Sequence, residues 1–321
     1  MTDIYLPEGE RFSTPENQAL LASRAGLEHA MNAGQTVEAI ATVCDEKMRL
    51  HVDLGVMRGI VPPEEAVHCR AGEVRKDIAV VSRVGKPIAV QITEMTEQHG
   101  ELIALLSRRA AQKDCLEHLL LHRRPGDLIW ARVTHLEPFG AFMDIGCGLS
   151  SLLSIDCISV SRISHPRDRL SVGALIPVVI KSMDPESGRI AVTLRELLGT
   201  WEENAAGFEV GQTVTGIVRS VESYGAFIEL APNLAGLSEI RNEEHAENMR
   251  ALIGHAVAVF IKSINPERMK IKLVVVDTAP CRIAPKKLAF FMSPEQTAHL
   301  ARWQYSPARC AKTVAVDFEA T

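Results

Sequence analysis

The sequence predicts a mainly β protein made of tandem small barrels joined by short helices. A block of residues at 126–145 returns at 211–230, and a second block at 180–190 returns at 261–271. Two blocks that recur in the same order indicate two copies of one structural unit. Inside each copy, short runs of alternating apolar and polar residues are separated by glycine, proline, asparagine and aspartate, which is typical of β-strands joined by tight turns.

The better defined copy covers residues 125–198 and contains five strand signals. The expected strands lie at about 128–137, 140–146, 150–155, 174–183 and 189–195. Gly140 falls within the strand pattern, as Gly225 does in the copy at 210–277, and a glycine in such a place typically marks a bulge or a sharp bend. Five short strands with a bend predict a closed five-stranded barrel of the OB type.

A third, more diverged copy is expected at 34–110, in front of the other two. Residues 34–44 and 50–55 align with the first strands of the later copies after a shift of one residue, and a late strand is expected at 87–95. The chain is therefore predicted to hold three tandem barrels.

Helical segments are expected before the first barrel and between the barrels, at 1–33, 111–124 and 199–209. Thr14 as the N-cap and Pro15 at the first helical position begin a predicted helix at 15–32. Apolar residues at helical spacing predict two connecting helices, at 110–122 and 195–206.

The composition fits a folded chain without a membrane segment, a metal site or a catalytic motif. Hydrophobic residues make up 46% of the sequence, but they form no run of the length that a membrane helix needs, and the N-terminus lacks a signal-peptide pattern. The protein is therefore expected in the cytoplasm. The 7 cysteines form no C-x-x-C pair and predict reduced, mostly buried thiols, and the 11 histidines are dispersed. We expect no enzyme activity, no metal and no cofactor.

The charge excludes a uniformly basic nucleic-acid-binding protein. The formal net charge is −5 at pH 7, whereas proteins held mainly by phosphate contacts carry an excess of lysine and arginine. Any affinity for nucleic acid must come from local basic patches and from aromatic stacking.

The repeated blocks resemble the S-one RNA-binding domain family. The resemblance rests on an aromatic residue before a Gly-Ala-Phe triplet, Phe139 to Phe142, and on a late strand with Asp184 and the Gly-Arg-Ile sequence that contains Arg189. It is close over 125–198, good over 210–275 and faint over 34–110.

The resemblance implies that Phe139, Phe142, Asp184 and Arg189 contact RNA. An exposed aromatic ring on a barrel can stack with a base for about 1 to 3 kcal/mol, whatever the base is. Further positive charge near the same face is expected from Arg162, His165, Arg167, Arg169 and Lys181. In the copy at 210–277 the expected RNA-binding residues are Tyr224, Phe227, Lys262 and Lys270.

Departures from the family pattern occur in all three units, and in the unit at 125–198 the loss of the family's histidine removes a stacking or donor group. The family's histidine after the third strand is replaced by Ser154 and, in the later copy, by Glu239, whose charge would repel phosphate. That copy also has an acidic segment, predicted as a loop at 241–247. The first unit carries no aromatic residue near its platform positions, Lys47 and Leu50, and is expected to dock on a protein or on the small ribosomal subunit.

Structural alternatives stay open for several of these residues. Phe142 and Phe227 can fill the barrel cores, as aromatic residues in strands often do. Arg189 can form an ion pair with Asp184, and the arginines between 162 and 169 can belong to an ordinary exposed loop.

The C-terminal segment at 278–321 interleaves basic and aromatic residues, and Ser293 is expected to begin a helix. One interpretation is nucleic-acid binding. The favoured one is that its aromatic residues pack against the neighbouring barrel while its charges face solvent.

The sequence thus predicts a cytoplasmic, RNA-binding protein that holds single-stranded RNA or messenger RNA, in translation or its regulation. A protein-docking scaffold without RNA binding is a second hypothesis, and the non-catalytic arm of an RNA-turnover complex is a third.

Overall fold

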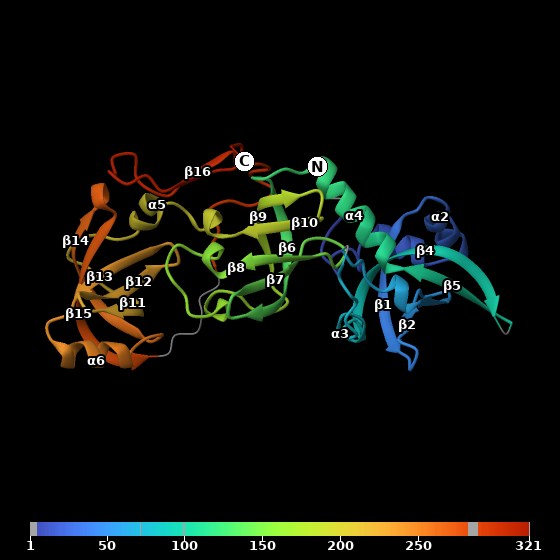
Figure 1. Cartoon of the computed structure of the whole chain (residues 1–321), viewed down its shortest axis with the longest axis horizontal. Coiled ribbons are helices and arrows are strands. Elements are labelled where there is room, and N and C mark those ends of the chain that lie inside the picture. Colours follow the sequence, from blue (N-terminus) through green and yellow to red (C-terminus); the bar gives the residue numbers. More distant parts are fainter. Residues whose placement is uncertain (1–4, 71, 99, 282–287, 321) are drawn as a thin grey trace.

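A computed structural model describes residues 5–70, 72–98, 100–281 and 288–320. Three closed barrels of five strands each lie in a row along the long axis of the molecule (Figure 1). Within the described residues, no helix has the length and apolar character needed to cross a membrane.

Each barrel repeats one strand order, in which the third and fifth strands are parallel neighbours. Barrel 1 consists of β1 (Thr36–Cys44), β2 (Leu50–Asp53), β3 (Arg58–Val61), β4 (Lys86–Gln98) and β5 (Glu101–Ser107). Barrel 2 consists of β6 (Leu128–Glu137), β7 (Gly140–Asp144), β8 (Ser150–Ser154), β9 (Leu175–Asp184) and β10 (Arg189–Thr193). Barrel 3 consists of β11 (Thr213–Glu222), β12 (Gly225–Ala231), β13 (Leu234–Glu239), β14 (Ala256–Asn265) and β15 (Lys270–Cys281).

The strands form because every second side chain enters a barrel interior. On β6, Ala131 and Val133 are fully buried, whereas the intervening Arg132 points outward. The alternation has the period of a β-strand, so the pattern that predicted the strands also fills the cores.

Gly140 was expected to mark a bulge or a sharp bend, and of these two the bulge does not lie at Gly140. The ladder shifts in the partner strand instead, between Val133 and His135. Gly140 is needed because a Cβ at this position would lie 2.4 Å from the carbonyl oxygen of Leu153. The glycine lets β7 and β8 approach closely, and the bulge on β6 supplies the bend.

The predicted helix at 15–32 is two helices, α1 (Pro15–Leu21) and α2 (Arg24–Asn32). Ser23 interrupts it because its backbone is extended and its side chain caps α2 by accepting a hydrogen bond from Gly26 N. The shorter helical elements are α3 (Ile78–Val81), η1 (Pro63–Glu65), η2 (Ile155–Cys157), η3 (Pro166–Asp168) and η5 (Pro266–Arg268).

The connections between barrels are helical, but only one is continuous. Helix α4 (Arg108–His122) joins barrels 1 and 2. The predicted helix at 195–206 is broken into η4 (Arg195–Leu198) and α5 (Trp201–Ala205), because Gly199 adopts a left-handed φ of +83° and Thr200 begins α5 with a capping box.

The acidic segment predicted as a loop at 241–247 lies mostly in a helix, α6 (Glu243–Ala251). Asn242 caps it by accepting a hydrogen bond from His245 N, and two glutamates in the first turn favour the helix N-terminus.

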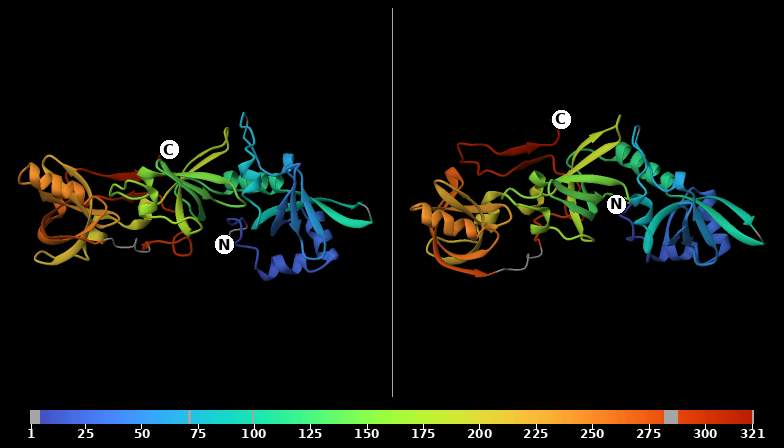
Figure 2. Two further views of the ribbon diagram at one scale, coloured as in Figure 1. Left: turned by 90° about the horizontal axis from the view of Figure 1, so that it is seen from below. Right: turned by 60° about the horizontal axis from the view of Figure 1, so that its bottom comes forward.

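The C-terminal residues 288–320 form an extended strap along barrels 2 and 3, including the hairpin of β16 (Arg302–Gln304) and β17 (Ala315–Asp317) (Figure 2). Ser293 begins only one turn, not the predicted helix. The favoured packing interpretation is confirmed for Trp303 and Tyr305, which are buried in the core cluster of barrel 3, and for Phe290, which packs partly buried against that of barrel 2. Phe291 is 46% exposed and does not follow it. The charged Arg302, Arg309 and Lys312 are exposed, as expected.

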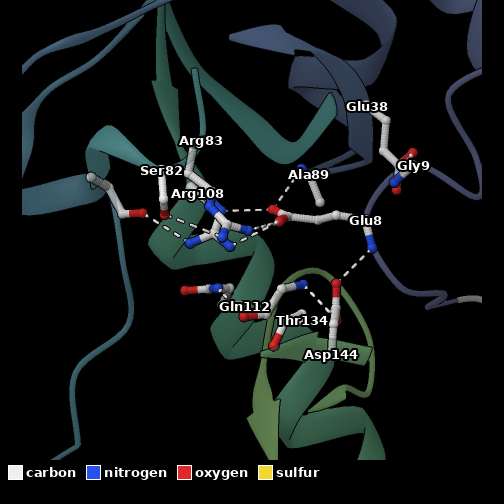
Figure 3. Close-up of polar contacts among 12 residues, drawn as sticks. Glu8, Gly9, Glu38, Ser82, Arg83, Ala89, Arg108, Gln112, Thr134 and Asp144 are labelled. Carbon is white, nitrogen blue, oxygen red and sulfur yellow. Dashed lines mark hydrogen bonds and ion pairs between the residues drawn. The ribbon is translucent and has the colours of Figure 1, made fainter. Parts of the chain in front are cut away.

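A buried ion pair joins barrel 1 to barrel 2 (Figure 3). Arg108 of α4 donates from Nε to Glu8 Oε1 at 2.6 Å, and Arg83 of barrel 1 reaches the same carboxylate at 3.2 Å. The backbone N–H of Glu8 donates to Asp144 Oδ2 of β7 at 2.8 Å. Burial opposes the ionised form of Glu8, but Arg108 outweighs it and lowers the pKa of Glu8.

The fully buried Asn233 joins barrel 2 to barrel 3. Its Oδ1 accepts from Val160 N at 2.9 Å, and its Nδ2 donates to the carbonyl oxygens of Arg195 and Gly199 at 2.7 and 2.8 Å. Its own carbonyl accepts from Tyr305 Oη of the strap at 2.7 Å. One side chain therefore fixes a loop of barrel 2 and the connecting segment to barrel 3.

Cys44, Cys69, Cys115, Cys147, Cys157 and Cys310 are free thiols, and three of these six are buried.

Candidate nucleic-acid interface

Barrel 2 carries an edge-to-face aromatic pair on its outer surface. Phe142 lies on β7 and Phe139 in the preceding turn, with ring centroids 6.0 Å apart and an interplanar angle of 89°. Phe139 is 54% exposed. Phe142 is half-buried and alternates with Ala141 and Met143, which are fully buried, so it points away from the core.

Barrel 3 repeats this pair. The rings of Tyr224 and Phe227 lie 6.2 Å apart at 88°, and Tyr224 is 61% exposed. Phe227 alternates with the buried Ala226 and Ile228 on β12, so it too lies outside the core. The core alternative for Phe142 and Phe227 is therefore wrong.

The strand register places a row of side chains across each aromatic pair. In barrel 2 the row runs from His135 to Phe142, Leu152 and Ala191. In barrel 3 the matching row is Ser220, Phe227, Leu237 and Lys272. We call these rows with their aromatic pairs the barrel 2 face and the barrel 3 face.

His135 belongs to the barrel 2 face, although it was not among the residues predicted to bind RNA. Its ring centroid lies 6.4 Å from that of Phe142, and its Nε2 is 2.7 Å from Glu137 Oε1. The bulge on β6 shifts the register by one residue and so places His135 opposite Phe142. The sequence does not reveal this bulge, and His135 could therefore not be predicted.

Asp184 organises the turn between β9 and β10. Its carboxylate accepts hydrogen bonds from the Ser187 hydroxyl and from Glu186 N, and these bonds lower the pKa of Asp184. Arg189 lies opposite Asp184 in the ladder and is exposed, yet no ion pair joins the two in the described structure. A direct ion pair between these two described residues is therefore not observed, although the charge of Arg189 contributes to the lowered pKa of Asp184.

Arg70 of barrel 1 lies beside Arg189, although it was not among the predicted residues, and it also forms an ion pair with Glu73 at 3.5 Å. Its guanidinium donates to the carbonyl oxygens of Gly188 and Ser150, each at 3.4 Å. Nothing in the local sequence of residue 70 indicates this contact, because it joins two barrels.

The predicted basic loop is divided by the structure. Arg162 and Arg167 are exposed, and His165 is half-buried and accepts from Arg167 Nε at 3.1 Å. Arg169 was expected to face RNA but is buried against Glu229 of barrel 3, which also accepts from Arg219 at 2.7 Å. Arg169 is therefore a structural residue of the barrel 2 to barrel 3 contact.

The three lysines predicted to bind RNA, Lys181, Lys262 and Lys270, are exposed. The Nζ of Lys181 lies 3.3 Å from Cys157 Sγ. Lys262 and Lys270 lie on barrel 3. Lys272 of the barrel 3 face forms an ion pair with Glu239 at 3.4 Å, where barrel 2 has Ala191 and Ser154.

Barrel 1 presents a different surface at the corresponding turn. Leu50 is buried, and Asp45 holds Arg49 at 2.7 Å and His51 at 3.2 Å. An ionic cluster thus takes the place of the aromatic pair.

Comparison with known proteins agrees with this geometry. Residues 123–195, which contain barrel 2, match the family described as S1 RNA binding domain, the S-one domain of the sequence analysis. The chain is 30% identical over 296 residues to small ribosomal subunit protein bS1 of Staphylococcus aureus strain N315, covering 87% of this chain and 73% of that protein. The bS1 protein of Staphylococcus saprophyticus is also 30% identical, over 79% of this chain and 64% of its own length.

A solved multidomain protein with nucleic acid binding domains from Streptococcus pneumoniae is 14% identical, over 75% of this chain and 73% of that one. The TM-score of 0.23 is too low for that superposition to support a conclusion. The sequence relationship to the ribosomal proteins is sufficient to assign the family: the chain belongs to the family of small ribosomal subunit protein bS1.

Proposed function

We propose that the protein binds single-stranded RNA, with messenger RNA at the ribosome as its target, through the barrel 2 face. The observation that carries the proposal is the outward edge-to-face pair of Phe139 and Phe142, in which the Phe139 ring is 54% exposed and the Phe142 ring lies 6.4 Å from that of His135. A base stacks on the exposed ring, and such stacking tolerates any base.

The charged groups around the pair suit an RNA backbone. Arg189 and Arg70 lie at one end of the barrel 2 face. Lys181 is on β9, and Arg162 and Arg167 are in the loop that precedes β9. Phosphate contacts of this kind position the strand, while the aromatic rings hold the bases. Asp184 serves the interface indirectly, by fixing the turn that carries Arg189.

Barrel 3 binds the same RNA more weakly. It has the aromatic pair, but Glu239 forms an ion pair with Lys272 and so neutralises its charge. The glutamates in the first turn of α6 follow shortly after Glu239 in the chain. Like charges close to a phosphate oppose its binding. Barrel 1, which lacks the pair, docks the protein on the small ribosomal subunit. Because ribosomes work in the cytoplasm, the proposed location of the protein is the cytoplasm.

The test is binding of a fluorescent single-stranded RNA to the full chain, measured by anisotropy. Phe139→Ala is expected to weaken binding by about 1 to 3 kcal/mol, or roughly 5- to 150-fold, and Tyr224→Ala by less. Phe260→Ala is the matched control, because Phe260 is 36% exposed on β14 and lies outside both faces.

Equal affinities for Phe139→Ala and Phe260→Ala would contradict the stacking site. If the wild-type chain binds no RNA at low salt, the protein-docking scaffold replaces the proposal.

A further inference from the structure

A cavity of about 590 Å³ lies between barrel 2 and the strap. Its walls come from the loop that follows β8, from Arg195 after β10, and from both strands of the strap hairpin. The residues that matter for ligand binding are Asp156, Arg162, Arg195, Trp303 and Val316. The volume falls within the range of about 300 to 1,000 Å³ typical of small-molecule sites.

The cavity continues the barrel 2 face. Ile155, which lines it, donates its backbone N–H to the carbonyl oxygen of Phe139 at 2.9 Å. Strands β8 and β10 run in parallel, so their C-terminal ends meet at the cavity, while Arg189 lies at the opposite end of β10. A strand of RNA that passes from Arg189 over the aromatic pair therefore arrives at the cavity.

The walls are held in place from both barrels. Val160 N donates to Asn233 Oδ1, and Ser161 N donates to the carbonyl oxygen of Pro232, both in barrel 3. On the strap side, Tyr305 O accepts from Trp201 N at 3.0 Å. Such a fixed cavity requires little ordering when a ligand binds.

The lining combines apolar walls with hydrogen-bond donors. Arg162 is exposed, and no hydrogen bond or ion pair of its side chain is present in the described part of the chain. Trp303 is 4% exposed, and its Nε1 atom is itself buried without an acceptor among the described residues, so Trp303 forms part of the wall and is not a donor open to the cavity. Arg195 donates to Glu196 Oε1 at 3.1 Å, so Arg162 is the cation best placed to take an anionic group.

We propose that this cavity binds one further nucleotide of the RNA held by the barrel 2 face, an inference that rests on the proposed function. Arg162 contacts the phosphate, because a guanidinium matches phosphate oxygens in charge and geometry. The base lies against Trp303 and the apolar strap residues, and Asp156 can accept a hydrogen bond from an N–H of the base. The strap thus contributes to RNA binding as well as to packing.

The test uses the full chain and a single-stranded RNA of about 12 nucleotides, within the site size of an OB fold, with one 4-thiouridine placed at successive positions. After irradiation, cross-linked peptides are mapped by mass spectrometry. We expect one position of the label to cross-link to the strap peptide around Trp303 or Val316. Affinity is measured in parallel for Arg162→Ala and Trp303→Phe, with Arg309→Ala as the control.

Arg162→Ala is expected to lose at least about fivefold in affinity, whereas Arg309→Ala, an exposed arginine of the strap outside the cavity, should stay within about twofold. Trp303→Phe keeps an aromatic ring in the core but removes the indole. Because the proposal places the base against the indole, this variant should lose the strap cross-link or bind RNA more weakly. The thermal unfolding midpoint of each variant is measured as a control and should equal that of the wild-type chain if the strap remains folded.

Two failures can be told apart. If Phe139→Ala weakens binding but Arg162→Ala equals Arg309→Ala and no strap peptide is cross-linked, the RNA does not enter the cavity and the proposed function stands. If the wild-type chain binds no RNA, both proposals fail.

Discussion

Arg108 and Glu8 form an ion pair whose side chains are only 3% and 5% exposed, at the junction of the N-terminal segment, α4 and barrel 2. Both side chains are desolvated, so removing either one would leave the charge of the other buried and uncompensated. The resulting prediction is that Arg108→Ala destabilises the protein by about 3 to 5 kcal/mol, because Glu8 would remain buried without its main cation.

The measurement is the free energy of unfolding in urea. Arg109→Ala is the control, since the neighbouring Arg109 is 53% exposed and pairs with Glu65. Its loss should cost no more than about 1 kcal/mol. Equal losses for the two variants would show that the buried pair does not stabilise the junction.

The same junction predicts a pH dependence. Burial, and then repulsion from Glu8, raises the pKa of Glu38 from 4.5 to about 7. Between these values the folded protein holds a proton that the unfolded chain releases, so this group makes the protein less stable as pH rises from 4.5 to about 7.

Glu38→Gln keeps an oxygen that can accept from Gly9 N and Arg11 N but removes the titration. The free energy of unfolding of this variant, relative to wild type, should therefore increase with pH across that window and by no more than about 3 kcal/mol. Glu46→Gln, at an exposed site, should show no such trend. A pH-independent difference for Glu38→Gln would refute the prediction.

Asn233→Ala should loosen the contact between barrels 2 and 3. The change removes three hydrogen bonds of the side chain and leaves Val160 N and two carbonyl oxygens without this partner. We expect a loss of at least about 2 kcal/mol in the free energy of unfolding and a broader distribution of particle dimensions in small-angle X-ray scattering.

Asn242→Ala is the matched control in the same barrel, because Asn242 only caps α6. It should cost about 1 kcal/mol and leave the scattering unchanged. If scattering is unchanged for both variants, other contacts hold the two barrels together.

Arg189→Ala should reduce the salt dependence of RNA binding. If Arg189 neutralises one phosphate of a single strand, the slope of log affinity against log salt should become shallower by about 0.7. Arg189→Lys should keep most of the slope, and Arg24→Ala, on the exposed side of α2, should keep all of it. An unchanged slope for Arg189→Ala would place the phosphate contact elsewhere.

The strands and the aromatic pairs could be predicted from sequence because their signals are local. Strand β6 begins and ends at the predicted residues 128 and 137, since alternation and turn residues are properties of neighbouring positions. The helix breaks at Ser23 and Gly199 were missed for a related reason: apolar spacing continues through both sites, while a cap and a left-handed glycine interrupt the backbone.

The sequence by itself determined the three barrels and the positions of Phe139 and Tyr224, because period-two alternation and repeated blocks encode them within short stretches. Only the tertiary structure decided which charges face solvent. Arg169 and Arg162 belong to the same loop, yet Glu229 of barrel 3 buries the first and leaves the second exposed. The cavity at Arg162 likewise depends on Trp303, which lies far away in the sequence. Such contacts form when separate units pack together, and no local pattern records them.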